Sequence, residues 1–249
     1  MRRPMSPSGH YQRSPLTEAI LDIQVELVGD FVTSELAKCH TGVAKEYPNS
    51  QDVTTSEGIF KFGESPESSA STKKIGYRFS SAAGSQLFQA RIDGFAFNRL
   101  APYNGWDLFR TEAKRLWLVY KSVAKPFLIK RVAVRYINCI DFPHPYIDLK
   151  EYFKTSPEIA SDLPQGMAQF FMQVVLPLPD VKSHVIITQT NAVPKIVNTI
   201  SVHFDLDLCR TEELPQDEDG LWSLLEEYRS KKKMIFEACI TDELRKLIR

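Results

Sequence analysis

No stretch of this 249-residue chain is both apolar enough and long enough to cross a bilayer as a helix. The first 14 residues include arginines but no apolar core, so they are unlike a secretory signal. We therefore expect a cytoplasmic protein without a membrane partner, in which residues 1–14 form a disordered tail.

Several short enzyme motifs are also missing from the sequence. It contains no G-x-x-x-x-G-K-[ST], G-x-G-x-x-G, G-x-S-x-G, H-E-x-x-H or C-x-x-C pattern. These absences argue against a nucleotide hydrolase, a dehydrogenase and a serine hydrolase, and no cofactor is predicted. An enzyme assembled from residues far apart in the sequence is the alternative that they leave open.

Neither sign of charge is in excess, because Lys and Arg number 31 and Asp and Glu also number 31. This balance argues against a protein-wide attraction for nucleic acid, although it leaves room for a local basic patch. The few cysteines are far apart and form no metal-binding pair: Cys39, Cys139, Cys209 and Cys239. We expect reduced thiols, three of them packed as small apolar groups.

The densest apolar periodicity lies between Trp106 and Pro126. Six residues recur at three- and four-residue spacing and share one helix face: Trp106, Phe109, Ala113, Leu116, Trp117 and Tyr120. Pro126 ends the predicted helix, because proline disfavours helical geometry at the residue before it. An aromatic helix face is either a binding site or part of the core, and this period favours packing against a sheet.

The strand predicted after this helix has two chemically different faces. Val132, Val134, Tyr136, Asn138 and Ile140 form the apolar face, whereas Arg131 and Arg135 lie on the other. The two arginines either bind an anionic ligand or pair with internal carboxylates, such as Asp22 or Glu26. Asn138 is expected to tie down a neighbouring loop or helix end. Arg131, Arg135 and Asn138 are therefore the candidate binding residues.

The central part of the chain resembles a known bacterial family. The pattern consists of Leu100, Pro102-Tyr103, Gly105-Trp106, Trp117 and the run Arg131-Val-Ala-Val-Arg135-Tyr136-Ile-Asn138. Similar ends are Pro15-Leu-Thr-Glu18-Ala19-Ile and Phe236 with Ile240-Thr241-Asp242. The resemblance is to a sporadically distributed family of bacterial proteins of unassigned function, which offers no catalytic residues to carry over. Its patchy distribution implies horizontal transfer, as for phage-defence and toxin–antitoxin genes.

Both halves of the chain are predicted to share one order of elements, β-α-β-β-β-α. The first half is expected to contain a strand over 20–28, a helix over 33–47, a short strand over 58–62 and a mobile loop over 64–72 before its remaining strands. The second half is expected to contain a strand over 128–140, a helix over 146–160, strands over 169–176, 184–190 and 199–208, and a helix from Asp219.

The expected fold is therefore α+β, an antiparallel sheet with helices packed on one face. Residues 15–249 are expected to form a single domain, with structural halves 15–126 and 127–249 related by a pseudo-twofold axis. This arrangement would be a saddle or an incomplete barrel, and its open face is the natural place for a ligand or partner.

Histidines and carboxylates supply an alternative candidate site. Asp141, His144 and Asp148 follow the central strand, and His203, Asp205 and Asp207 lie on the polar face of a later strand. Such residues can hold a metal or perform acid–base chemistry, with Asp141, His144, His203 and Asp205 as the candidates. The competing interpretations are a polar turn and a solvated strand face, because no motif defines a nucleophile, a base and an orienting group.

Three functional hypotheses follow from these observations. The leading one is a non-catalytic interaction or regulatory module, whose partner is a protein encoded by a neighbouring gene in a phage-defence or toxin–antitoxin type system. The second is a nucleic-acid or nucleotide binding protein that uses Arg131 and Arg135 or the basic triplet Lys231–Lys233. The third is a metal-dependent nuclease or phosphoesterase. The sequence predicts no oligomeric state.

Overall fold

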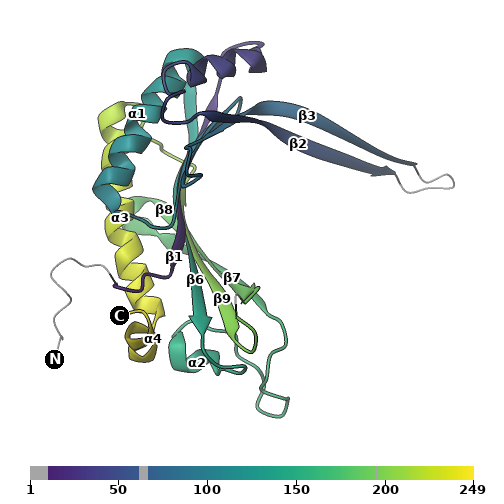
Figure 1. The fold of residues 1–249 in the computed structure, drawn as a ribbon, viewed down its shortest axis with the longest axis vertical. Helices are drawn as coiled ribbons and strands as arrows, with labels where there is room; N and C mark the ends of the chain where they lie inside the picture. The colour runs from purple at the N-terminus through teal and green to yellow at the C-terminus, as the bar shows by residue number, and fades with distance from the viewer. Residues whose placement is uncertain (1–10, 62–66, 195) are drawn as a thin grey trace. The chain divides into compact units, whose positions relative to one another are not determined.

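A computed structural model describes residues 11–61, 67–194 and 196–249 (Figure 1). The fold is α+β, as predicted: nine strands form an antiparallel sheet that does not close. The strand order is β2-β3-β4-β5-β1-β6-β9-β8-β7. None of the helices in the described part of the chain combines the length and apolarity that crossing a membrane requires.

The strands alternate with helices along the chain. The strands are β1 (Leu16–Glu26), β2 (Asn49–Lys61), β3 (Glu67–Ser80), β4 (Gln86–Arg91), β5 (Gly94–Leu100), β6 (Leu128–Phe142), β7 (Phe171–Leu178), β8 (Ser183–Ala192) and β9 (Ile200–Arg210). The α-helices are α1 (Trp106–Ala124), α2 (Leu149–Tyr152), α3 (Glu218–Cys239) and α4 (Asp242–Leu247). Two 3₁₀ helices, η1 (Thr33–His40) and η2 (Pro179–Val181), complete the described elements.

The chain divides into two compact units that interrupt each other in the sequence. The inserted unit consists of residues 20–133 and 210–221. The terminal unit consists of described residues 11–19, 134–209 and 222–249. Strands β1 and β6 contribute residues to both units.

The core of the inserted unit lies between α1 and its strands. Trp106 and Trp117 are 5% and 1% exposed, which confirms the prediction that the aromatic helix face is core. Trp117 packs edge-on against Phe95 of β5, with ring centroids 5.7 Å apart. The hydroxyl of Tyr120 donates a hydrogen bond of 2.9 Å to the backbone oxygen of Arg91. The helix ends at Lys125, whose left-handed backbone precedes Pro126.

A tight hairpin joins β4 and β5. Arg91 pairs with Gly94, so Ile92 and Asp93 are the turn residues. A Cβ atom on Gly94 would lie only 2.4 Å from the backbone oxygen of Ile23, and this close approach requires glycine. The hairpin also gives the first half of the chain one strand more than the predicted order.

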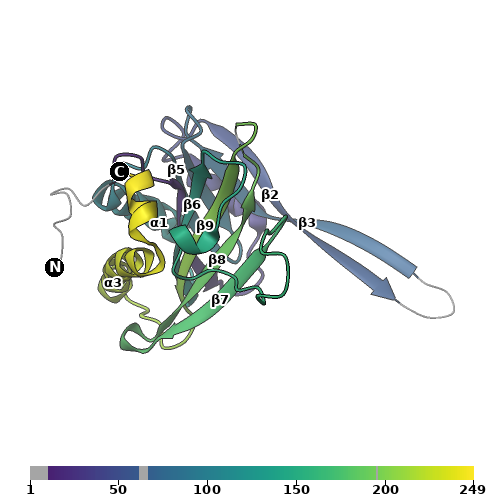
Figure 2. The same ribbon diagram turned by 90° about the horizontal axis from the view of Figure 1, so that it is seen from below.

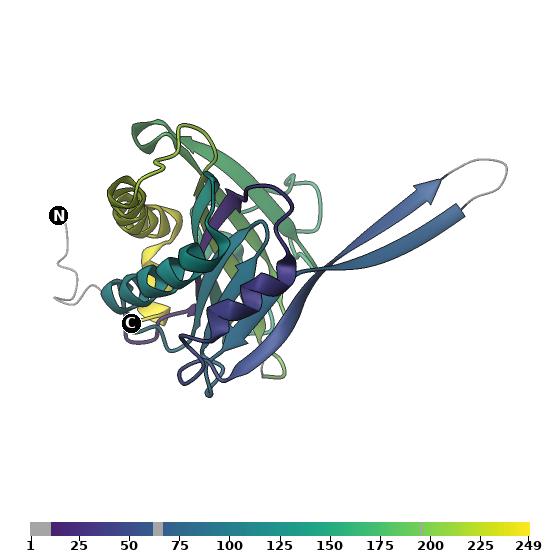
Figure 3. The same cartoon turned by 90° about the horizontal axis from the view of Figure 1, so that it is seen from above.

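Strands β2 and β3 form a long two-stranded arm, of which the sequence analysis predicted only short pieces, among them the strand over 58–62. The two strands pair along their whole length, from Asn49 opposite Ser80 to Lys61 opposite Glu67. Only the last part of β3, from Gly76, also pairs with β4, so the outer part of the arm extends beyond the other strands of this unit (Figure 3). Strand β3 occupies much of the segment predicted as a mobile loop over 64–72. The prediction was wrong there because this Ser-rich sequence carries no apolar alternation that would indicate a strand. Residues 62–66, which include the end of the predicted strand over 58–62 and the start of the predicted loop, lie outside the described residues.

Two predicted helices are shorter in the structure. The helix predicted over 33–47 is the 3₁₀ helix η1 followed by turns. The helix predicted over 146–160 is reduced to α2, although Asp148 caps it by accepting a 2.9 Å hydrogen bond from the backbone nitrogen of Lys150. Helix α2 stops there because Phe153 leaves it to form a β-bridge with Ile240.

The core of the terminal unit lies between α3 and the strands β6, β9 and β8 (Figure 2). Side chains on one face of β9 are buried, among them Val202, Phe204 and Leu208. On α3, the hydroxyl of Tyr228 lies 2.8 Å from the hydroxyl of Ser183 on β8. The three predicted strands and the predicted last helix of this half are therefore confirmed.

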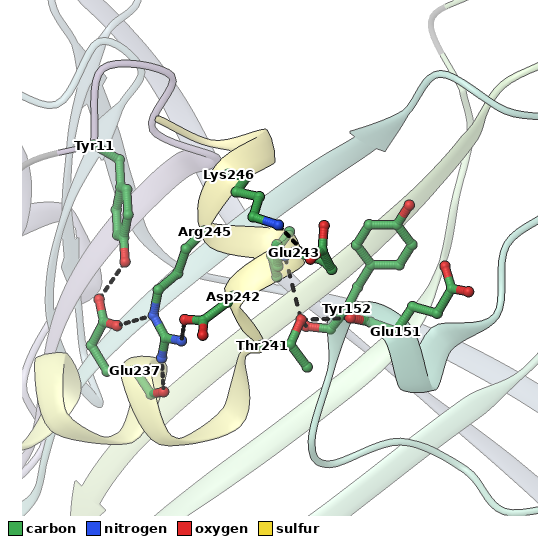
Figure 4. Close-up of polar contacts among 10 residues, drawn as sticks. Tyr11, Glu151, Tyr152, Glu237, Thr241, Asp242, Glu243, Arg245 and Lys246 are labelled. Carbon is green, nitrogen blue, oxygen red and sulfur yellow. Dashed lines mark hydrogen bonds and ion pairs between the residues drawn. The ribbon is translucent and has the colours of Figure 1, made fainter. Parts of the chain in front are cut away.

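The first described residues are attached to the last helices of the terminal unit (Figure 4). The hydroxyl of Tyr11 donates a 2.5 Å hydrogen bond to Glu237, which also accepts one from Arg245 at 2.8 Å. The backbone nitrogen of Arg13 donates to the oxygen of Ile248 at 3.1 Å. Residues 11–13 of the predicted disordered tail are thus held in place, and residues 1–10 lie outside the described ones.

The predicted internal repeat is not shown by these elements. The first structural half contains β1 to β5 and the second contains β6 to β9, so the two halves differ by a strand. A 3₁₀ helix also stands where the first half was expected to have an α-helix. The pseudo-twofold relation stays a prediction.

Candidate functional site

Arg131, the first of the predicted binding residues, lies in the inserted unit beside a carboxylate. Its guanidinium lies 3.2 Å from Asp22 of β1, and that carboxylate also receives a 2.8 Å hydrogen bond from Arg91. Burial lowers the pKa of Arg91, but attraction by Asp22 and Asp93 together with the hydrogen bonds to both outweighs it, and the pKa is raised. Asp22 thus lies between two arginines, as the carboxylate-pairing alternative predicted.

Arg135 lies in the terminal unit and pairs with a different carboxylate, on β9. Its Nε and one terminal nitrogen donate to the same oxygen of Asp205, at 2.8 and 2.5 Å. The Asp205 side chain is only 9% exposed, whereas that of Arg135 is 46% exposed. The hydrogen bonds to Asp205, and attraction by Asp207 and Glu18, raise the pKa of Arg135. These three acids oppose the binding of a further anion.

Asn138, the third predicted binding residue, is buried and faces the core. Its amide donates to the backbone oxygen of Phe204 at 3.0 Å and to that of Tyr136 at 3.4 Å. It therefore ties β6 to the backbone of the neighbouring strand β9, not to a loop or helix end as expected. Strand pairing explains this, because the side chain reaches the next strand before any loop.

The alternative metal or acid–base residues are not gathered into one site. Asp141 accepts a 2.6 Å hydrogen bond from the hydroxyl of Ser201, and Asp205 is engaged with Arg135. His144 is exposed in the turn after β6, and His203 is half-buried on β9. Among the residues that the structure describes, no group of three or more His, Cys, Asp or Glu residues could hold a metal ion.

The basic triplet Lys231–Lys233 does not form one phosphate-binding surface. Lys231 pairs with Asp180, and Lys233 is exposed. Lys232 is half-buried, with its amino group 4.0 Å from the centroid of the Tyr136 ring. Burial, followed by repulsion from Lys233 and Arg229, lowers the pKa of Lys232 to about 8. The three amino groups thus have three different environments.

Replacing Lys232 by Met is expected to raise the free energy of unfolding by about 2 kcal/mol at pH 7, because a half-buried charge is removed. The pKa of Lys232 is about 8 in the folded protein. The unfolded chain therefore binds more protons between pH 8 and the ordinary lysine value near 10.5, and wild-type stability rises with pH across that window. Urea unfolding at pH 7 and pH 10 measures both effects. A difference between variant and wild type that does not shrink at pH 10 would contradict the assignment.

A cavity of about 490 Å³, which the sequence analysis did not predict, opens at the start of α1 in the inserted unit. Apolar side chains on its wall include Phe97, Leu108 and Phe109; charged ones are Glu46, Arg99, Glu112 and Arg115. Arg115 donates two hydrogen bonds to Glu112, which also accepts one from Tyr47 at 2.7 Å. Arg99 donates to the backbone oxygen of Pro102. The four charges in the wall are balanced, and Arg115 and Glu112 are paired with each other, so the cavity favours no charged ligand.

Strand β7 of the terminal unit is an edge strand with exposed apolar side chains. It is the last strand in the sheet order and pairs with β8 on one side only. Its eight residues, Phe171–Leu178, include no charged side chain. Phe171, Val175 and Leu176 are 69%, 56% and 46% exposed. Natural edge strands are usually protected by charges, prolines or bulges; β7 carries Pro177 near its end but no charge, so its residues 171–176 have the character of a covered edge.

Further exposed apolar residues lie in the segments that follow β8 and lead into β7. Val193, Ile196 and Val197 follow β8, whose residue Thr190 pairs with Phe171. Leu163 is exposed in the segment that leads into β7. The other edge of the sheet differs, because β2 carries Asp52, Glu57 and Lys61 among its residues. The charge-free run over 171–178 was visible in the sequence, but its position at an edge was not.

Comparison with known proteins gives no assignment. No model of a protein family matches the chain, and no curated protein matches it either. The resemblance to the sporadically distributed bacterial family therefore stays a prediction.

Proposed function

We propose that this protein is a non-catalytic interaction module whose contact surface is the outer edge of β7. The observation that carries the proposal is an edge strand of eight residues without a charge, with large apolar side chains exposed along it. An extended polypeptide segment adds to such an edge as a further strand. Its main-chain hydrogen bonds provide affinity, and the alternating side chains of the two strands provide specificity.

The surroundings of the predicted binding residues favour this function over nucleic-acid binding. Arg131 and Arg135 are engaged with Asp22 and Asp205, so neither offers an uncompensated charge to a phosphate. The net charge of the whole chain is zero. A nucleic-acid interface requires a basic patch or stripe, because the attraction to phosphates is electrostatic.

The resemblance to the bacterial family implies where the partner is encoded. Genes with a patchy distribution often act together with a neighbouring gene, as in phage-defence and toxin–antitoxin systems. We therefore propose that the protein regulates or neutralises the product of an adjacent gene, and that this product supplies the added strand.

Replacing Val175 by Lys is expected to abolish binding of the neighbouring gene product, because it places a charge on the contact strand. The matched control is Thr54→Lys, which places the same charge at an exposed position of the opposite edge strand β2. Binding is measured with both proteins purified, and thermal unfolding shows that both variants are folded. Binding at least tenfold weaker for Val175→Lys, with the control unchanged, is the expected result.

Two other results would overturn the proposal. One is undiminished binding by the Val175→Lys variant. The other is binding to DNA or RNA that weakens steeply with salt, or metal-dependent hydrolysis of a phosphodiester, either of which would support a competing function.

A further inference from the structure

We propose that in the isolated protein the outer edge of β7 is covered by β7 of a second copy of the same chain. This inference rests on the proposed function, because it names what occupies the same edge before a partner binds. The partner would then compete with the second copy, and self-pairing would keep an apolar edge covered in the partner's absence.

The charge of β7 restricts what can lie beside it. A strand added to this edge places its side chains against Phe171–Leu178, which offer no opposite charge to pair with. A partner segment with charged residues would bury them uncompensated, at a free-energy cost. Strand β7 is itself an uncharged segment of matching length. The polar strand β2 at the other edge, with Asp52 and Glu57, is a poorer match.

The geometry of an antiparallel sheet makes β7 complementary to itself. Two antiparallel copies of one strand are related by a twofold axis, and each residue then makes the same contact twice. The axis is normal to the sheet, so both copies keep the same side chains on the same face. In such a pair, one residue at the axis lies opposite the same residue of the other copy. Val174 or Val175, near the middle of β7, can occupy this position.

The exposed apolar side chains account for the stability of such a pair. Phe171, Val175 and Leu176 would gain neighbours on both faces of the joined sheet. A single strand pair buries less than the roughly 1000 Å² expected of a stable interface. We therefore infer that the exposed residues that follow β8, Val193 and Val197 among them, also enter the contact.

The oligomeric state of the full-length protein tests the inference. Light scattering and sedimentation are expected to give a dimer for the wild type and for Thr54→Lys, and a monomer for Val175→Lys. A Val175→Glu variant is expected to be monomeric too, because like charges would face each other near the axis. An equimolar mixture of the Lys and Glu variants is expected to form a heterodimer, because the opposite charges then become neighbours.

The outcomes separate this inference from the proposed function. If the wild type is monomeric at every concentration, or if its dimer survives Val175→Lys, self-pairing of β7 is wrong. The proposed function nevertheless stands in either case if the neighbouring gene product binds the wild type and not Val175→Lys. Conversely, a dimer that Val175→Lys disrupts, in a protein that does not bind the neighbouring product, supports self-pairing and removes the proposed partner.

Discussion

Replacing Arg135 by Ala is expected to lower the free energy of unfolding by about 3 kcal/mol. The two hydrogen bonds that the Asp205 carboxylate accepts both come from Arg135. The Asp205 side chain is 9% exposed, so its charge would be left buried without a cation. We place the effect at the lower end of the range for broken buried pairs, because Arg135 itself is half exposed and its removal admits water.

Arg131→Ala is the matched control, from the same strand. Asp22, which pairs with Arg131, keeps the hydrogen bond from Arg91, so this carboxylate is not stranded and a loss of about 1 kcal/mol is expected. The double variant Arg135→Ala with Asp205→Ala is expected to recover most of the lost stability, because it removes the stranded charge. Chemical denaturation measures all three variants. An Arg135→Ala protein of wild-type stability that loses its partner would instead identify Arg135 as a binding residue.

Replacing Trp117 by Ala is expected to destabilise the protein by about 3–5 kcal/mol. The indole is 1% exposed and packs against the rings of Phe95 and Tyr120. Its Nε1 donates a 3.0 Å hydrogen bond to Glu218. The substitution leaves a cavity beside these rings and removes one hydrogen bond to Glu218, which keeps its ion pair with Lys121, so the cavity is the main cost.

Two further substitutions separate these contributions. Trp117→Phe keeps much of the ring volume but removes the hydrogen bond to Glu218, so an intermediate loss is expected. Leu118→Ala alters the adjacent residue, which is 48% exposed, and is expected to change stability by less than about 0.5 kcal/mol. A Trp117→Ala protein that keeps its melting temperature and loses only binding would contradict the core assignment.

The sequence predicted best those elements in which one face is buried against a sheet. The period of Trp106, Phe109 and Trp117 gave α1 almost to the residue, and the alternation in β6 and β9 gave both strands. In each case the pattern is strong because burial acts on every third, fourth or second residue. The arm of β2 and β3 lacks that pattern, since in its outer part these two strands pair with each other and not with the rest of the sheet.

The partners of polar side chains were harder to predict. Asp22 was correctly named as a partner of Arg131, because both lie on the polar faces of long strands. Asp205 was assigned to a metal alternative, and its pairing with Arg135 was not anticipated. That contact depends on β9 lying beside β6, which is a property of the strand order. The significance of β7 depends on the same order, since only topology places a strand at an edge.

The division of the chain into an inserted and a terminal unit has a consequence during synthesis on the ribosome. Residues 20–133 are nearly a complete unit and emerge early, so most of the inserted unit can fold while translation continues. The terminal unit cannot fold until its helix α3, which follows β9 in the chain, has been made. Until α3 emerges, Val202, Phe204 and Leu208 of β9 present their apolar side chains without the helix that buries them. The nascent chain is therefore most exposed to aggregation, and most dependent on chaperones, between the synthesis of β9 and that of α3.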